Sequence, residues 1–217
     1  MNEVVVHGIP SERKLKEGDI VTLDLALRLD GYCSDTAITV GIGHISPRMQ
    51  KLLDVTRQSL QLAISQIRPG KKWSEIARLM QYQVEKNGFN MVREFVGHGV
   101  GREMHEEPKV PNFVTAEQLR TDFMLRRGMT LAVEPMVVMG RREVELYPDG
   151  WTVYTVDHMP AAHFEHTVAV TDTGVDILTD GRPPQPEAAA TPAVLPAVVA
   201  QPAAPSAVAT GTVATGT

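Results

Sequence analysis

Two aspartates fall on neighbouring strands of a predicted β-hairpin. Two runs of β-forming residues are separated by Asp30-Gly31, a typical two-residue turn. In the register that this turn sets, Ala26 faces Asp35, so Asp24 and Asp35 share one side of the sheet, roughly 7 Å apart at Cβ. Two carboxylates this close repel each other unless a positive charge lies between them, and a metal ion is the simplest such charge. The alternative is that one aspartate caps a turn or faces water.

Two histidines and two glutamates extend this set. His98 and His105 lie in the glycine-rich segment GHGVGREMHEEP, whose backbone lets side chains converge. Glu134 in LAVEPMVV and Glu165 in HFEHTVAV are charges in apolar strands, which is unfavourable unless they are paired or ligated. Two aspartates, two glutamates and one histidine form an oxygen-rich set suited to Mn, Fe, Co or Zn. Two adjacent divalent ions can hold a bridging hydroxide, so the spacing predicts a dinuclear metallohydrolase whose substrate bond is undefined.

The elements that must position these residues form an α+β pattern. Strands are predicted at 4–6, 20–29, 32–40, 91–95, 129–138, 151–155 and 166–171, and helices at 46–67 and 73–87. Strands outnumber helices, and the helices are adjacent in the middle of the chain. The odd-numbered side of the first long strand, Val21 to Leu29, is apolar and must be buried against another element.

Composition limits the possible partners and the location. The formal net charge of −5 argues against a nucleic-acid or anionic-membrane surface. The sequence has no run of 18 apolar residues and shows no secretory signal at Met1, which predicts a soluble cytoplasmic protein. Cys33 is the only cysteine, which excludes an internal disulfide, and we interpret it as a small packing residue.

A change in composition predicts a domain boundary near Arg182. Residues 183–217 contain 7 of the 15 prolines and a single charged residue, Glu187. Such a segment has too few large apolar side chains to offset its ordering entropy. We predict a folded catalytic domain at 1–182 and a disordered tail, rich in alanine and proline, at 183–217.

Six segments resemble the type I methionine aminopeptidases. They are HGIP at His7–Pro10, GDIVTLDLAL, DGYCSDTAITV, GHGVGREMHEEP, GMTLAVEPMV and FEHTVAVT, and they follow the family order over residues 2 to 180. The resemblance implies the pita-bread fold, a curved antiparallel sheet with paired helices on its outer side. Full-length members have two helices and opening strands before the point where this chain begins. The expectation is therefore an N-terminally truncated member whose first half of the sheet lacks its helices. Because the resemblance assigns both predicted helices to the second half, we expect an exposed leucine-rich patch on the side of Val21 to Leu29.

The resemblance also implies roles for individual residues. The metal ligands for two divalent ions would be Asp24, Asp35, His98, Glu134 and Glu165, with Asp35 and Glu165 bridging. His7 and His105 would contact the substrate, and Trp151 would lie at the mouth of the methionine pocket. Glu134 would also take the proton of the attacking water, and His105 would donate a hydrogen bond to the substrate carbonyl. We expect the remaining histidines to be loop or surface residues: His44, His158, His163 and His166.

The implied function is removal of the N-terminal methionine from nascent polypeptides by metal-activated hydroxide. The implied partners are those N-termini and the ribosome, with no nucleic-acid site, no membrane, and a monomer when complete. Two alternatives remain. One is a catalytically impaired pita-bread remnant that acts as a binding module, and the other is a different pita-bread aminopeptidase, such as a proline-directed one.

Overall fold

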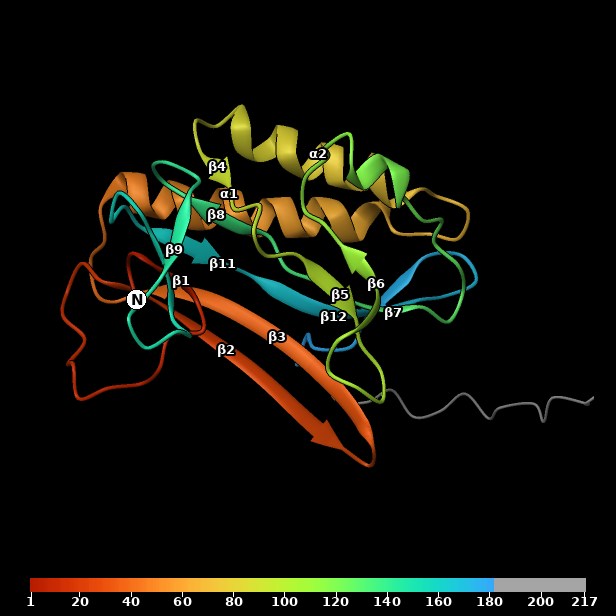
Figure 1. The fold of residues 1–217 in the computed structure, drawn as a ribbon, viewed down its shortest axis with the longest axis horizontal. Helices are drawn as coiled ribbons and strands as arrows, with labels where there is room; N and C mark the ends of the chain where they lie inside the picture. Colours follow the sequence, from red (N-terminus) through yellow and green to blue (C-terminus); the bar gives the residue numbers. More distant parts are fainter. Residues whose placement is uncertain (182–217) are drawn as a thin grey trace, which may run out of the picture. The chain divides into compact units, whose positions relative to one another are not determined.

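A curved antiparallel sheet of seven strands carries most of the residues singled out above (Figure 1). In the computed structural model, which describes residues 1–181, its strands lie in the order β2, β3, β12, β7, β5, β6, with β13 paired to β12. Their bounds are β2 Ile20–Leu29, β3 Tyr32–Gly41, β5 Gly97–Gly99, β6 Glu106–Val110, β7 Thr130–Val133, β12 Glu165–Val170 and β13 Val175–Ile177. The predicted tail at 183–217 lies outside the described residues.

Two three-stranded sheets complete the β-structure of the described residues. One has the order β11, β8, β4 and the other β1, β10, β9. Their bounds are β1 Val4–Val6, β4 Asn90–Met91, β8 Met136–Val138, β9 Val144–Leu146, β10 Val153–Thr155 and β11 Ala161–His163. The strands predicted at 91–95 and 151–155 are therefore shorter than expected.

The chain passes between sheets at two short interruptions. Glu134-Pro135 separates β7 from β8, and Phe164 separates β11 from β12. The prediction of one continuous strand at 129–138 is therefore wrong, because Pro135 has no N–H to donate to a strand ladder. Glu134 consequently lies directly after β7 rather than inside a strand.

Two α-helices are present in the described residues, close to their predicted bounds. Helix α1 spans Pro47–Gln66, and the Ser46 side chain caps it by accepting a hydrogen bond from the Met49 N–H. Helix α2 spans Trp73–Glu85. Its first turn is capped by a residue far away in the sequence, because the Asp122 carboxylate accepts hydrogen bonds from the Ser74 N–H and hydroxyl. A short 3₁₀ helix at Gln118–Arg120 follows later in the chain.

The main core lies between the helices and the sheets. Figure 1 shows α1 and α2 side by side on one side of the curved sheet, and α1 contacts β3, β7, β8 and β11. The largest buried apolar side chains are Ile20, Leu52, Trp73, Ile76, Met80, Leu125 and Leu131. Burying such a side chain stabilises the fold by about 1.5–3 kcal/mol. This packing gives the sheet a rigid backing on the helix side.

The first hairpin adopts the predicted register. Ala26 pairs with Asp35 and Asp24 with Ala37, which places both aspartates on the same side of the sheet. Asp30 and Gly31 have φ values of 50° and 82°, the left-handed conformations that a two-residue hairpin turn requires.

The opposite side of this hairpin is exposed and apolar. Leu23, Leu25, Leu27 and Leu29 are 52%, 64%, 55% and 70% exposed, and Tyr32 and Ile38 of β3 are also exposed on this side. We call these six residues the leucine face. The expected leucine-rich patch is thus confirmed, and no described helix covers it. No helix among residues 1–181 is long and apolar enough to span a membrane.

Candidate metal centre

The predicted ligands lie in two adjacent rows that cross the curved sheet. In the first row, Asp24 pairs with Ala37 and Ala37 with Glu165. Extending the antiparallel register of β12 and β7 by one residue, from the His166–Val133 pair, brings Glu134 opposite Glu165. Residues paired across a sheet share a face, so this row presents three carboxylates on one side.

The second row lies two residues along the strands and adds Asp35 and His98. Thr167 links Asp35 to β12, because its hydroxyl accepts a hydrogen bond from the Asp35 N–H and donates one to the Asp35 carbonyl. Thr167 pairs with Ala132, and Ala132 pairs with His98. The two rows share one face, so side chains from positions 24 to 165 converge there.

The distances within this cluster suit a shared cation. One ligand atom each from Asp35, His98 and Glu165 lie within 4.8 Å of one another. His98 Nε2 is 3.8 Å from Asp35 Oδ2 and 3.6 Å from Glu134 Oε1. Atoms that bind one ion at about 2.0–2.2 Å lie at most about 4.4 Å apart, so these separations require little adjustment.

His98 is oriented with one nitrogen available to the cluster. Its Nδ1 lies 2.9 Å from the Gly99 carbonyl oxygen, so Nδ1 carries the proton and donates to that carbonyl. Burial lowers the pKa of His98, which favours the neutral ring. A neutral imidazole with Nδ1–H bonded to a carbonyl presents a lone pair at Nε2, the arrangement usual for metal-binding histidines.

The carboxylates are electrostatically unfavourable without a cation. Burial, and then the nearby Asp24, raise the pKa of Asp35 to about 6. Burial followed by neighbouring carboxylates also raises the pKa values of Glu134 and Glu165. Glu165 is 2% exposed, and its Oε1 has no hydrogen-bond partner in the part of the chain that the structure describes. Within residues 1–181, the recorded ion-pair partners of these side chains are histidines and include no lysine or arginine. The donor set therefore fits divalent cations.

The other predicted site residues lie around this cluster. The rings of His98 and His105 are 4.2 Å apart, and His105 is exposed. His7 has a φ of 60° and stacks on Trp151 with ring centroids 4.7 Å apart. Burial raises the pKa of Asp24, and nearby His7 acts in the opposite direction. Asp24 has a side chain that is 39% exposed, so it marks the open rim of the cluster.

His163 is a site residue that sequence reasoning missed. The prediction that it is a loop or surface residue is wrong, since it ends β11 and is 2% exposed. Its Nε2 lies 3.6 Å from Glu134 Oε2, and its Nδ1 lies 4.0 Å from Asp24 Oδ2. Strand alternation contained the signal, because residues two apart in an extended chain share a face and His163 precedes Glu165 by two. Of the other three histidines, His44 and His158 are exposed, whereas His166 is half-buried in β12.

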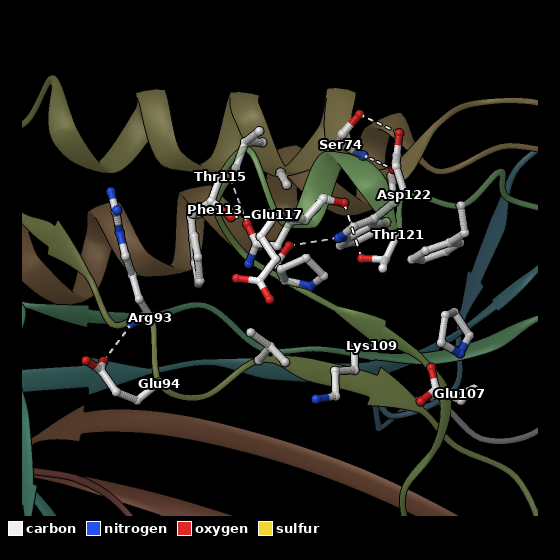
Figure 2. Close-up of a pocket in the computed structure, with 18 residues that line it drawn as sticks. Ser74, Arg93, Glu94, Glu107, Lys109, Phe113, Thr115, Glu117, Thr121 and Asp122 are labelled. Carbon is white, nitrogen blue, oxygen red and sulfur yellow. Dashed lines mark hydrogen bonds between the residues drawn. The ribbon is translucent and has the colours of Figure 1, made fainter.

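A separate hollow of about 640 Å³ lies between the start of α2, β6 and the segment 111–123 (Figure 2). Figure 2 shows Lys109 and Glu107 of β6 below it and Phe113 and Glu117 above. None of the five predicted metal ligands lines this hollow. The metal cluster and this cavity are therefore distinct features.

Comparisons of sequence and of structure both match this chain to known metallopeptidases. The model of metallopeptidase family M24 matches residues 1–172. Methionine aminopeptidase 1 of Bacillus subtilis is 47% identical over 179 residues, which cover 82% of this chain and 71% of the relative. The crystal structure of methionine aminopeptidase from Thermotoga maritima has 47% identity and a TM-score of 0.78, covering 82% of this chain and 71% of that one. The prolidase from Pyrococcus horikoshii shares the fold with a TM-score of 0.65 at 22% identity, covering 83% of this chain and 45% of that one.

Proposed function

Because the chain belongs to metallopeptidase family M24 and has its pita-bread fold, we propose that it is a dinuclear aminopeptidase that removes N-terminal methionine from nascent polypeptides. The observation that carries the proposal is the convergence of ligand atoms from Asp35, His98 and Glu165 in a buried acidic cluster. The substrate follows from relatives named methionine aminopeptidases at 44% to 47% identity. The site of action is the cytoplasm, with nascent chains at the ribosome as the source of substrate.

Five side chains would hold the two ions. They are Asp24, Asp35, His98, Glu134 and Glu165, the set that the resemblance to type I methionine aminopeptidases implies, and the same resemblance assigns the shared positions to Asp35 and Glu165. The oxygen-rich donor set suits Co, Mn, Fe or Zn. Divalent ions bound there would activate a water molecule and polarise the scissile carbonyl group.

The protein's own groups would handle the protons and the developing charge. Glu134 directs Oε1 toward His98 and the interior of the cluster, where it can take a proton from water and return it to the leaving amine. His105 lies beside His98 but is exposed, so it can reach a substrate that lies over the cluster. A hydrogen bond from His105 to the carbonyl oxygen would strengthen as negative charge develops there.

The rim would bind the substrate chain. His7 is held by its stacking on Trp151 and by an edge contact with Phe95, whose ring centroid is 5.6 Å away. Trp151 is 57% exposed, which leaves an aromatic face open to an apolar side chain. We assign His7 to the region of the scissile nitrogen and Trp151 to the mouth of the methionine pocket.

Activity with two peptides tests this function. The purified chain, loaded with Mn²⁺ or Co²⁺, should release methionine from Met-Ala-Ser and should leave an Xaa-Pro dipeptide intact. Cleavage of the dipeptide alone would favour a proline-directed enzyme, which the likeness to prolidase makes the relevant alternative. Two bound ions with no cleavage of either peptide would favour the binding-module alternative. Glu134→Gln is the matched control that should abolish release.

A further inference from the structure

His163 is a buried polar residue without a role in the proposed chemistry. Its backbone is fixed at the end of β11, because the Thr39 hydroxyl donates to the His163 carbonyl and accepts from the His163 N–H, both at 2.8 Å. Its side chain is 2% exposed, and neither ring nitrogen has a hydrogen-bond partner among residues 1–181. Buried polar groups are almost always satisfied, so an unsatisfied ring here requires a specific explanation.

The acidic neighbours of this ring are all predicted metal ligands. Nε2 lies 3.6 Å from Glu134 Oε2 and 3.9 Å from Glu165 Oε2. His98 Nε2 lies 3.6 Å from the other oxygen of Glu134, Oε1. The two oxygens of Glu134 are therefore divided, with Oε1 directed to His98 and Oε2 directed to His163.

This division is the arrangement expected of a carboxylate that binds a metal through one oxygen and is held by a hydrogen bond at the other. A hydrogen bond from an N–H to oxygen needs about 2.7–3.2 Å, so a movement of a few tenths of an ångström at Glu134 would complete it. A ligand role for His163 fits less well. A cation between its Nε2 and Glu134 Oε2 would contact the oxygen of Glu134 that is not the one directed to His98.

We propose that His163 is a positioning residue of the metal centre, whose Nε2–H donates to Glu134 Oε2 and holds that carboxylate turned toward the cations. Glu165 Oε2 is the second acceptor within reach of the same N–H. The inference rests on the metal centre proposed above, and it assigns His163 to the orientation of the ligands rather than to the substrate.

Two substitutions separate a hydrogen-bond donor from a packing residue. His163→Leu fills a similar volume without a donor, whereas His163→Gln retains an N–H at similar reach. His166→Leu is the matched control, because His166 lies on the opposite side of β12 and contacts Thr179 instead. Calorimetric titration of the full chain with Co²⁺ measures the affinity of each variant.

We expect His163→Leu to weaken Co²⁺ binding roughly 10- to 100-fold, the usual effect of losing a group that orients a ligand. His163→Gln should recover most of this loss, and His166→Leu should bind like the wild type. Wild-type affinity in His163→Leu would overturn the inference, as would equal weakening in the leucine and glutamine variants at unchanged circular dichroism. Failure of the wild type to bind Co²⁺ would instead refute the proposed function itself.

A measurement on the unmodified chain covers the case in which the variants do not fold. Pulsed electron paramagnetic resonance of the Mn²⁺-loaded wild type detects the nitrogen nuclei of coordinated imidazoles. One coordinated imidazole, that of His98, is expected. Two coordinated imidazoles that persist in His105→Ala would make His163 a ligand and overturn its assignment as a positioning residue.

Discussion

Replacing Asp35 with asparagine should stabilise the metal-free protein while removing its response to metal. Asp35 is 9% exposed, and burial together with Asp24 raises its pKa from 3.8 to about 6. Its Oδ1 accepts a hydrogen bond from the Thr36 N–H at 3.0 Å, and an asparagine oxygen can accept the same bond. The substitution therefore removes a charge with little change in shape or hydrogen bonding.

The direction in which stability changes with pH follows from the number of protons that the folded and unfolded states bind. Because the folded-state pKa of Asp35 lies above the unfolded value of 3.8, the folded protein binds more protons than the unfolded chain between these two values. The contribution of Asp35 to the stability of the metal-free wild type therefore falls as the pH rises from about 4 to about 6, and the penalty persists above pH 6. A shift of about two units corresponds to roughly 3 kcal/mol, and solvent reaching the open rim at Asp24 reduces this to about 1–3 kcal/mol. Asparagine carries no such penalty.

Urea unfolding followed by circular dichroism measures both effects. With a chelator present, Asp35→Asn should be more stable than the wild type by about 1–3 kcal/mol at pH 8, with the difference nearly gone at pH 4. With Mn²⁺ at 100 times its dissociation constant, the wild type should gain about 2.7 kcal/mol, and the variant should gain much less. Asp30→Asn, in the turn of the same hairpin at a φ of 50°, is the control and should change stability by under about 0.5 kcal/mol.

Either of two results would refute this reasoning. One is a metal-free Asp35→Asn protein that is less stable than the wild type at pH 8. The other is a variant that Mn²⁺ stabilises as strongly as it stabilises the wild type. In both cases the cluster could not be a set of carboxylates held together for a shared cation.

Three further predictions concern the number of bound ions, the role of His105 and the exposed leucine face. Elemental analysis should find close to two divalent ions per wild-type chain, and a metal-free protein after reconstitution would contradict the centre. His105→Ala should retain both ions but lose turnover roughly 10²–10³-fold, and loss of metal instead would make His105 a ligand. The chain should bind a hydrophobic dye and self-associate, and Leu25→Ser with Leu27→Ser should reduce both effects. Leu178→Ser, at an equally exposed leucine outside the leucine face, should not, and a dye-negative monomer would contradict this prediction.

Local signals predicted the hairpin and the helices well. Asp30-Gly31 set the register of β2 and β3, because a two-residue turn with two positive φ values permits only one pairing of the flanking strands. Ser46-Pro47 placed the start of α1 correctly, since capping is decided by the residues at the helix end itself. These features depend on neighbours in sequence, and the sequence therefore specifies them.

The interruptions at Glu134-Pro135 and Phe164 were not predicted. At Glu134-Pro135 the chain leaves the seven-stranded sheet and enters a smaller one, whereas at Phe164 it passes from that smaller sheet into the seven-stranded sheet. Where a strand changes sheets depends on the curvature of the whole assembly rather than on local propensity. Pro135 was a local signal that a central strand was an unsuitable assignment.

The difference between local and long-range signals also explains why the burial of His163 was not predicted. Its position two residues before Glu165 was visible in the sequence, and alternation places both side chains on one face. Its burial was not visible, because the contacts that fix it come from Thr39, 124 residues earlier in the chain. Residues with direct chemistry could thus be predicted from type and spacing. A residue that orients them could be recognised only after distant strands were brought together.

Folding and metal binding should consequently be coupled in this chain. The proposed ligands come from positions 24 to 165, so the cluster cannot exist until β2, β3, β5, β7 and β12 have paired. Once it forms without a cation, the raised pKa values of Asp35, Glu134 and Glu165 oppose the folded state at neutral pH. A divalent cation reverses that repulsion and adds its binding free energy to the stability of the sheet. The carboxylates that weaken the metal-free fold are therefore the groups expected to give the centre its affinity.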